Sequence, residues 1–161
     1  MKLDIFKLQF RTYGTDKISK GYTYKAQRDS RNHLNAINKP VGLWSSPKDN
    51  KNFYTWKNWC ISENFNTETL NTWVDFTIKP GSRVLMLTSE VNMDWCYKHY
   101  GYHGNTGTSG RCFNWKLIEK DFDAVYFDSG KWSCLKSKYN FYSWDVDSLC
   151  VFNLNCICSK K

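Results

Sequence analysis

The sequence lacks the features that mark several large classes of protein. It has no run of five or more lysines or arginines, which argues against a dedicated nucleic-acid-binding arm. It has no internal repeat and no low-complexity tract, and residues 1–6 do not begin the long apolar core of a secretory signal peptide. With 41% hydrophobic and 24% charged residues, the composition indicates neither a membrane span nor disorder. We therefore expect a cytoplasmic, globular protein without a membrane segment.

The cysteines also lack a recognisable pattern. Seven cysteines are an odd number, and without a signal peptide reduced thiols are the simplest interpretation. Cys156 and Cys158 are too close together for a zinc knuckle and have no second C-x-x-C pair to complete it. His99 and His103 lie four apart, but the glycines around them favour a loop over a helix face. No metal site is expected.

Aromatic residues and positive charge are what the sequence has in excess. Eight Trp, ten Tyr and ten Phe make up 17% of the chain, and such side chains suit cores, base stacking and protein interfaces alike. The formal net charge of +8 favours anionic partners such as nucleotides, nucleic acids or acidic protein surfaces. A length of 161 residues fits one domain.

Hydrophobic periodicity and turn residues predict a mixture of short strands and short helices. Helices are expected over residues 53–65, 90–97 and 114–120, and strands over residues 3–10, 40–47, 73–79, 83–87, 122–127 and 149–154. The strands over 73–79 and 83–87 flank Pro80 and Gly81, which predicts a hairpin or two neighbouring strands. Residues 16–39 form a polar excursion, and residues 101–110 an exposed loop. This mixture is typical of an α+β domain.

Polar side chains stand at the ends of three expected strands. Arg11 follows the first, Ser45 and Ser46 end the second, and Asp145 and Asp147 open the last. Residues two apart share one face of a strand, so the two carboxylates would lie side by side in spite of their repulsion. Such a pair is either the edge of an active site or a solvated strand end that caps local backbone. In one cleft, the three sets would surround an anionic substrate that bears a sugar.

This order of motifs resembles the ADP-ribosyltransferase family. Its members carry an arginine or histidine, then a Ser-Thr-Ser type strand, then a Glu-x-Glu or Gln-x-Glu motif. Residues 10–15 look like the family's first strand and turn, and residues 122–127 are similar to the aspartate-led strand before its last motif. The resemblance implies one ADP-ribosyltransferase-like domain over residues 1–161, with packed β-sheets and short flanking helices.

The resemblance also implies how NAD would be bound. Arg11 would neutralise the NAD diphosphate or position a ribose, because a guanidinium binds phosphate through a planar fork. Ser45 or Ser46 would orient the catalytic acid and the nicotinamide ribose. Tyr13 and Trp44 would supply a stacking wall for nicotinamide or adenine.

The resemblance assigns the chemistry to the two aspartates. Asp147 would stabilise the oxocarbenium ion that develops as nicotinamide leaves, and Asp145 would aim or deprotonate the acceptor. The acceptor of ADP-ribose would be a host protein or nucleic acid. Aspartate is one methylene shorter than the family's usual glutamate, and Ser45 and Ser46 do not complete its three-residue pattern.

A second resemblance leaves other functions open. A Gly-Leu-Trp-Ser type segment, a Trp-rich helix and a closing Trp-Asp-x-x-Ser are similar to features of small phage proteins. A noncatalytic phage protein that binds a host defence factor or captures a nucleotide is therefore one alternative. A nucleic-acid-binding module, based on charge and aromatic content, is the other.

Overall fold

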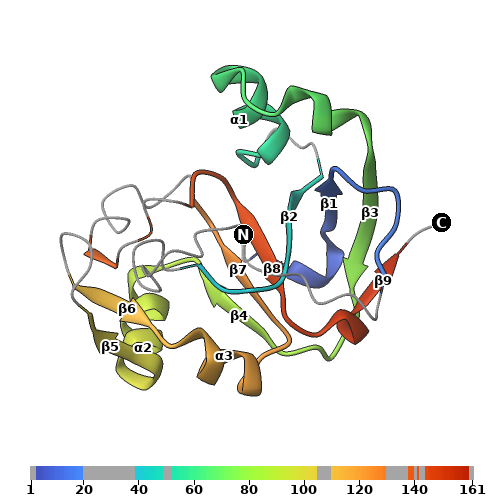
Figure 1. Cartoon of the computed structure of the whole chain (residues 1–161). Coiled ribbons are helices and arrows are strands. Elements are labelled where there is room, and N and C mark those ends of the chain that lie inside the picture. Colours follow the sequence, from blue (N-terminus) through green and yellow to red (C-terminus); the bar gives the residue numbers. More distant parts are fainter. Residues whose placement is uncertain are drawn as a thin grey trace.

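The computed structural model describes residues 3–19, 39–48, 52–104, 110–129, 138, 139, 141 and 144–159. They form a mixed α+β structure around one curled seven-stranded sheet (Figure 1). The strands of this sheet are β1 (Gln9–Tyr13), β2 (Leu43–Pro47), β3 (Trp73–Ile78), β4 (Val84–Leu87), β7 (Ala124–Phe127), β8 (Ser148–Val151) and β9 (Ile157–Ser159). The helices are α1 (Trp56–Glu63), α2 (Glu90–Tyr100) and α3 (Trp115–Asp121), with 3-10 turns η1 (Ile5–Lys7), η2 (Thr67–Asn71) and η3 (Leu154–Cys156).

The strand order is β4-β7-β8-β2-β1-β3-β9, and every pair is antiparallel except β4 with β7. The prediction that residues 73–79 and 83–87 form a hairpin or neighbouring strands is therefore wrong. β3 lies between β1 and β9, whereas β4 is the far edge strand. The segment that connects β3 to β4 is hydrogen-bonded to other parts of the chain. The Lys79 N–H donates to the Cys156 carbonyl, and the Asp123 N–H donates to the Arg83 carbonyl.

The sheet curls around the first of its two hydrophobic clusters. The ring of Phe10 on β1 lies 6.2 Å from that of Tyr126 on β7, although β2 and β8 separate these strands. In a flat sheet, strands three places apart are about 14 Å apart, so the side chains meet inside the curl. This cluster also contains Phe76, Leu149 and Ile157, each at most 4% exposed.

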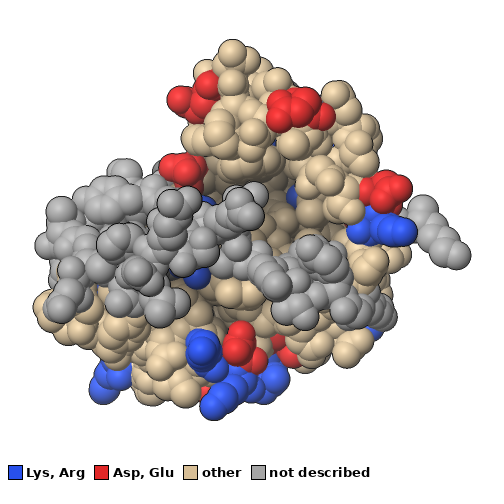
Figure 2. All heavy atoms as spheres, viewed as in Figure 1, with Lys and Arg blue, Asp and Glu red and all other residues tan. Residues whose placement is uncertain are grey.

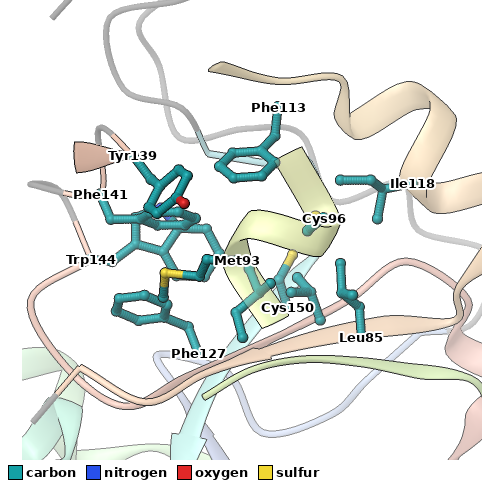
Figure 3. Close-up of a cluster of buried hydrophobic side chains, with 12 residues drawn as sticks. Leu85, Met93, Cys96, Phe113, Ile118, Phe127, Tyr139, Phe141, Trp144 and Cys150 are labelled. Carbon is teal, nitrogen blue, oxygen red and sulfur yellow. The ribbon is translucent and has the colours of Figure 1, made fainter. Parts of the chain in front are cut away.

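The second cluster lies on the opposite face, beneath α2 and α3 (Figure 3). Met93 and Cys96 reach down from α2 and are fully buried against the sheet. Aromatic rings fill one side of the cluster, where Phe127 stacks on Phe141 with centroids 4.8 Å apart and Trp144 packs against both. Much of the aromatic excess therefore builds the core.

The three predicted helices are confirmed, and each begins where a polar side chain accepts a backbone N–H. The cap residues are Thr55 for α1, Ser89 for α2 and Asn114 for α3. These side chains satisfy donors that have no partner inside the helix, so they mark where each helix starts. None of the helices in the described part of the chain is long and apolar enough to cross a membrane.

Two predicted segments differ in local structure. The expected strand over residues 3–10 begins with η1, because the Asp4 carboxylate accepts the Phe6 N–H and starts a turn before β1. The expected loop over residues 101–110 contains β5 (Gly101–His103), which pairs with β6 (Arg111–Phe113). A Cβ at Gly101 would lie 2.3 Å from Tyr97, so this glycine allows close packing of the chain after α2. The polar excursion over 16–39 falls largely outside the described residues.

Replacing Tyr126 with phenylalanine tests the packing inside the curl. The Tyr126 hydroxyl is buried without a hydrogen-bond partner among the described residues, and burial raises the pKa of Tyr126. Because an unsatisfied buried hydroxyl is costly, we expect Tyr126→Phe to leave the free energy of unfolding unchanged or raise it by about 1 kcal/mol. Urea denaturation measures this change.

Tyr139→Phe is the matched control for that substitution. Its hydroxyl donates to the Asp94 carboxylate, so its removal should lower the free energy of unfolding by about 1 kcal/mol or more. A loss of similar size in Tyr126→Phe would contradict the assignment of its hydroxyl as unsatisfied.

Candidate functional site

Three neighbouring strands bring polar side chains into one row across the sheet. Arg11 on β1 is directly opposite Ser46 on β2 and directly opposite Asp75 on β3. Directly opposed residues of antiparallel strands project on the same face. Phe10 points into the curl, so the alternation of side chains places Arg11 and its row on the outer face.

Arg11 forms a two-point ion pair with Asp75. Its Nε and Nη2 donate to the two carboxylate oxygens at 2.6 and 2.9 Å. The Lys48 Nζ lies 3.0 Å from the same carboxylate, so one anion is shared by two cations. The hydrogen bond from Arg11 lowers the pKa of Asp75, and the same bond raises the pKa of Arg11.

Aromatic rings flank the Arg11 guanidinium. Its Cζ lies 4.6 Å from the ring centroid of Trp73 and 5.8 Å from that of Tyr13. Tyr13 and Trp73 are themselves directly opposed on β1 and β3. The expectation that Tyr13 stacks against nicotinamide or adenine stays a prediction; the structure places its ring beside Arg11 and Trp73, and Trp73 is 46% exposed.

The two serines of β2 occupy different faces. Ser46 is opposite Arg11, and its Oγ accepts the Trp56 N–H at the start of α1. Ser45 is opposite Leu149, whose side chain lies inside the curl, and its hydroxyl donates to the Leu149 carbonyl. Of the two predicted serines, Ser46 is therefore the one beside Arg11.

Asp147 is buried in a set of structural contacts. Its Oδ1 accepts the Ser129 N–H at 2.7 Å, and its Oδ2 accepts the Tyr54 N–H at 3.0 Å. The Asp147 N–H in turn donates to the Tyr54 carbonyl, and the residue is 3% exposed. Asp147 and Ser46 thus both hold the segment that leads into α1, and this fixes the start of the helix against the sheet.

Asp145 joins that contact set through its backbone, because its carbonyl accepts a hydrogen bond from the Ser129 hydroxyl at 3.4 Å. β8 begins at Ser148, so the expectation that Asp145 and Asp147 share a face of the last strand is wrong: both precede it. Asp145 is half-buried and attracts the Lys39 ammonium, although desolvation lowers the pKa of Lys39. Lys39 as a residue is exposed, but its Nζ lies 5.2 Å from the Trp44 ring centroid.

Trp44, the second expected stacking residue, packs into the core beneath α2 and α3. Its ring meets that of Trp144 edge to face, with centroids 4.8 Å apart. Trp44 is two residues before Ser46 and therefore projects on the same outer face. Trp44 as a residue is half-buried.

Sequence reasoning missed Asp75, Lys48 and Trp73 as members of this site. The alternation over residues 73–79 was a usable signal, because it places Trp73 and Asp75 on one face of a strand. The pairing of β3 with β1 could not be predicted from the sequence. About sixty residues separate these strands along the chain, and hydrophobic periodicity indicates only local structure.

On the face shown in Figure 2, acidic side chains lie near the α1 end of the molecule, and Lys and Arg side chains of the described residues lie mainly at the lower end. Comparisons of the chain with protein-family models, with curated proteins and with solved structures give no match.

The Arg11–Asp75 pair predicts a defined pH dependence. The pKa of an aspartate in an unfolded chain is about 3.9. In the folded chain the pairing with Arg11 lowers the pKa of Asp75. The stabilisation of the fold by the Arg11–Asp75 pair is therefore fully present above about pH 4. It is lost as the pH falls through the lowered pKa of Asp75 in the folded chain. We expect Asp75→Asn to lower the Tm at neutral pH and to flatten the acid decline of Tm. Thermal melts of both proteins across the acid range measure this, and parallel declines would contradict it.

Substitutions of Asp147 and Asp145 should differ sharply in their effect on the free energy of unfolding. In Asp147→Asn, either amide orientation sets an NH₂ group against the N–H of Tyr54 or Ser129, which we expect to cost about 2 kcal/mol. Asp145→Asn keeps a polar, half-buried side chain and should change the free energy of unfolding by less than about 0.5 kcal/mol. Urea denaturation measures both changes, and equal losses in the two variants would contradict the predicted difference.

Proposed function

We propose that this chain is an ADP-ribosyltransferase-like protein that binds NAD and transfers ADP-ribose to a host macromolecule. One observation supports the proposal: β1, β2 and β8, the strands that carry Arg11 and Ser46 or follow Asp147, are neighbours in the sheet. Arg11 is directly opposite Ser46, and Ser46 and Asp147 both bind residues 54–56. Composition and periodicity contain no information about this adjacency.

The proposed binding roles follow from the face that each side chain occupies. Arg11 binds the diphosphate through its guanidinium fork. The Ser46 hydroxyl, which already accepts the Trp56 N–H, donates its proton to a ribose oxygen. Tyr13 and Trp44 stack against the nicotinamide or adenine ring. Ser45 holds β2 to β8 from the other face.

The proposed chemistry breaks the bond between the ribose and nicotinamide. Nicotinamide leaves with the bonding electron pair, and the positive charge on the ribose is stabilised by Asp147, whose Oδ1 stays bound to the Ser129 N–H. Asp145 takes the proton of the acceptor nucleophile as that nucleophile bonds to the ribose carbon. Because Asp147 is 3% exposed, the ribose reaches it only when Tyr54 moves off its carboxylate.

A noncatalytic binding protein is the second candidate. Both oxygens of Asp147 already accept backbone donors, which is a sufficient structural reason for this carboxylate. Large hydrophobic side chains are exposed near the row, on and around α1: Tyr54, Ile61, Phe65 and Trp73. Such residues are enriched at protein interfaces, so this surface fits a protein that binds a host factor.

Calorimetry with NAD, followed by an assay for released nicotinamide in the same samples, tests the proposal. We expect NAD binding and nicotinamide release by the unaltered protein, with water as the nucleophile in place of the host acceptor. Arg11→Lys keeps the charge but loses the fork, so it should weaken NAD binding by about tenfold or more. Arg83→Lys, the same change at an exposed arginine on the far edge of the sheet, should bind NAD as the unaltered protein does.

The outcomes separate the two candidates. Folded protein that does not bind NAD would overturn the proposal. NAD binding without nicotinamide release would overturn the transferase activity and favour the noncatalytic protein. Equal weakening by Arg11→Lys and Arg83→Lys would remove Arg11 from the binding site.

A further inference from the structure

The charges around Arg11 do not balance. Among the described residues, Asp75 is the one carboxylate that contacts both Arg11 and Lys48, so the three side chains together retain one positive charge. The side chains of Arg11 and Asp75 are only 12% and 19% exposed, whereas that of Lys48 is 41% exposed. The remaining charge therefore lies where an anion from solution can reach it.

We propose that Asp75 is a built-in competitor for the diphosphate of a nucleotide, and that Arg11 and Lys48 together form the diphosphate-binding pair. Carboxylates and phosphates offer similarly spaced oxygens to a guanidinium fork, so either one occupies the same two N–H groups. In the described structure Asp75 takes both. This inference rests on the site of the proposed function and adds its regulation: the ligand binds by exchange with an internal carboxylate.

The backbone positions of Arg11 and Lys48 do not depend on Asp75. Arg11 lies in the middle of β1, paired on both sides, and its guanidinium keeps the Trp73 ring at 4.6 Å as support. Lys48 follows the last residue of β2, and its N–H donates to the Gln9 carbonyl. Exchange therefore requires a rotation of the Asp75 side chain and no movement of the strands.

The exposed Trp73 ring identifies a nucleotide as the diphosphate ligand. It is 46% exposed and borders the guanidinium, so an aromatic base attached to the diphosphate has a surface on which to stack. Inorganic pyrophosphate shares the charged part of that ligand and lacks the base. It is therefore the simplest probe of the exchange.

The test is calorimetric titration of inorganic pyrophosphate into the unaltered protein and Asp75→Asn. Removing the competitor should tighten pyrophosphate binding by about tenfold or more. Asp121→Asn makes the same charge change on α3, in the other half of the molecule, and should leave the affinity unchanged. Adding Lys48→Ala to Asp75→Asn should reverse most of the gain. Unchanged or weaker binding by Asp75→Asn, or an equal gain in Asp121→Asn, would overturn the proposal.

A second measurement does not depend on the folding of a variant. In ¹⁵N spectra of the unaltered protein, pyrophosphate should shift the Arg11 Nε–H signal, because its acceptor changes from the Asp75 carboxylate to phosphate. An unshifted signal at saturating pyrophosphate would overturn the exchange. Tighter pyrophosphate binding in Asp75→Asn without nicotinamide release from NAD would keep this inference and reject the transferase. Nicotinamide release with no effect of Asp75→Asn on pyrophosphate would do the reverse.

Discussion

The pairing of β1 with both β2 and β3 is the constraint on which the rest of this molecule depends. It sets the ring of Phe10 inside the curl and, one residue later, leaves Arg11 on the outer face between Ser46 and Asp75. A shift of one residue in this register would exchange the two faces and bury the guanidinium in an apolar cluster. The hydrophobic core and the candidate site are thus specified by the same set of backbone hydrogen bonds.

Local structure was largely readable from the sequence, and the arrangement of strands was not. The caps Thr55 and Ser89 mark helix starts through hydrogen bonds within one turn, which pattern reasoning can find. The β3–β4 hairpin was expected because the strands are close in sequence, yet each finds its partner far along the chain. Asp147 looked like an exposed half of a pair because its partner, the Tyr54 N–H, is about ninety residues away.

Asp147 and Asp123 join segments that are far apart in the sequence. Asp147 connects the entry of α1 to residues before β8, and Asp123 accepts the Arg83 N–H and the side-chain amide of Asn153. The hydrogen bond from the Arg83 backbone lowers the pKa of Asp123. A carboxylate that accepts several N–H groups fixes the position of a connecting segment relative to the strands of the sheet.

The position of β8 decides when the sheet can close. β8 lies between β7 and β2, so it joins the β4–β7 half to the half that contains β1, β2, β3 and β9. It is also one of the last strands along the chain. While the ribosome is still synthesising the protein, the inner edges of both halves stay unpaired until residues 148–151 emerge. The nascent chain therefore exposes open strand edges until late in its synthesis.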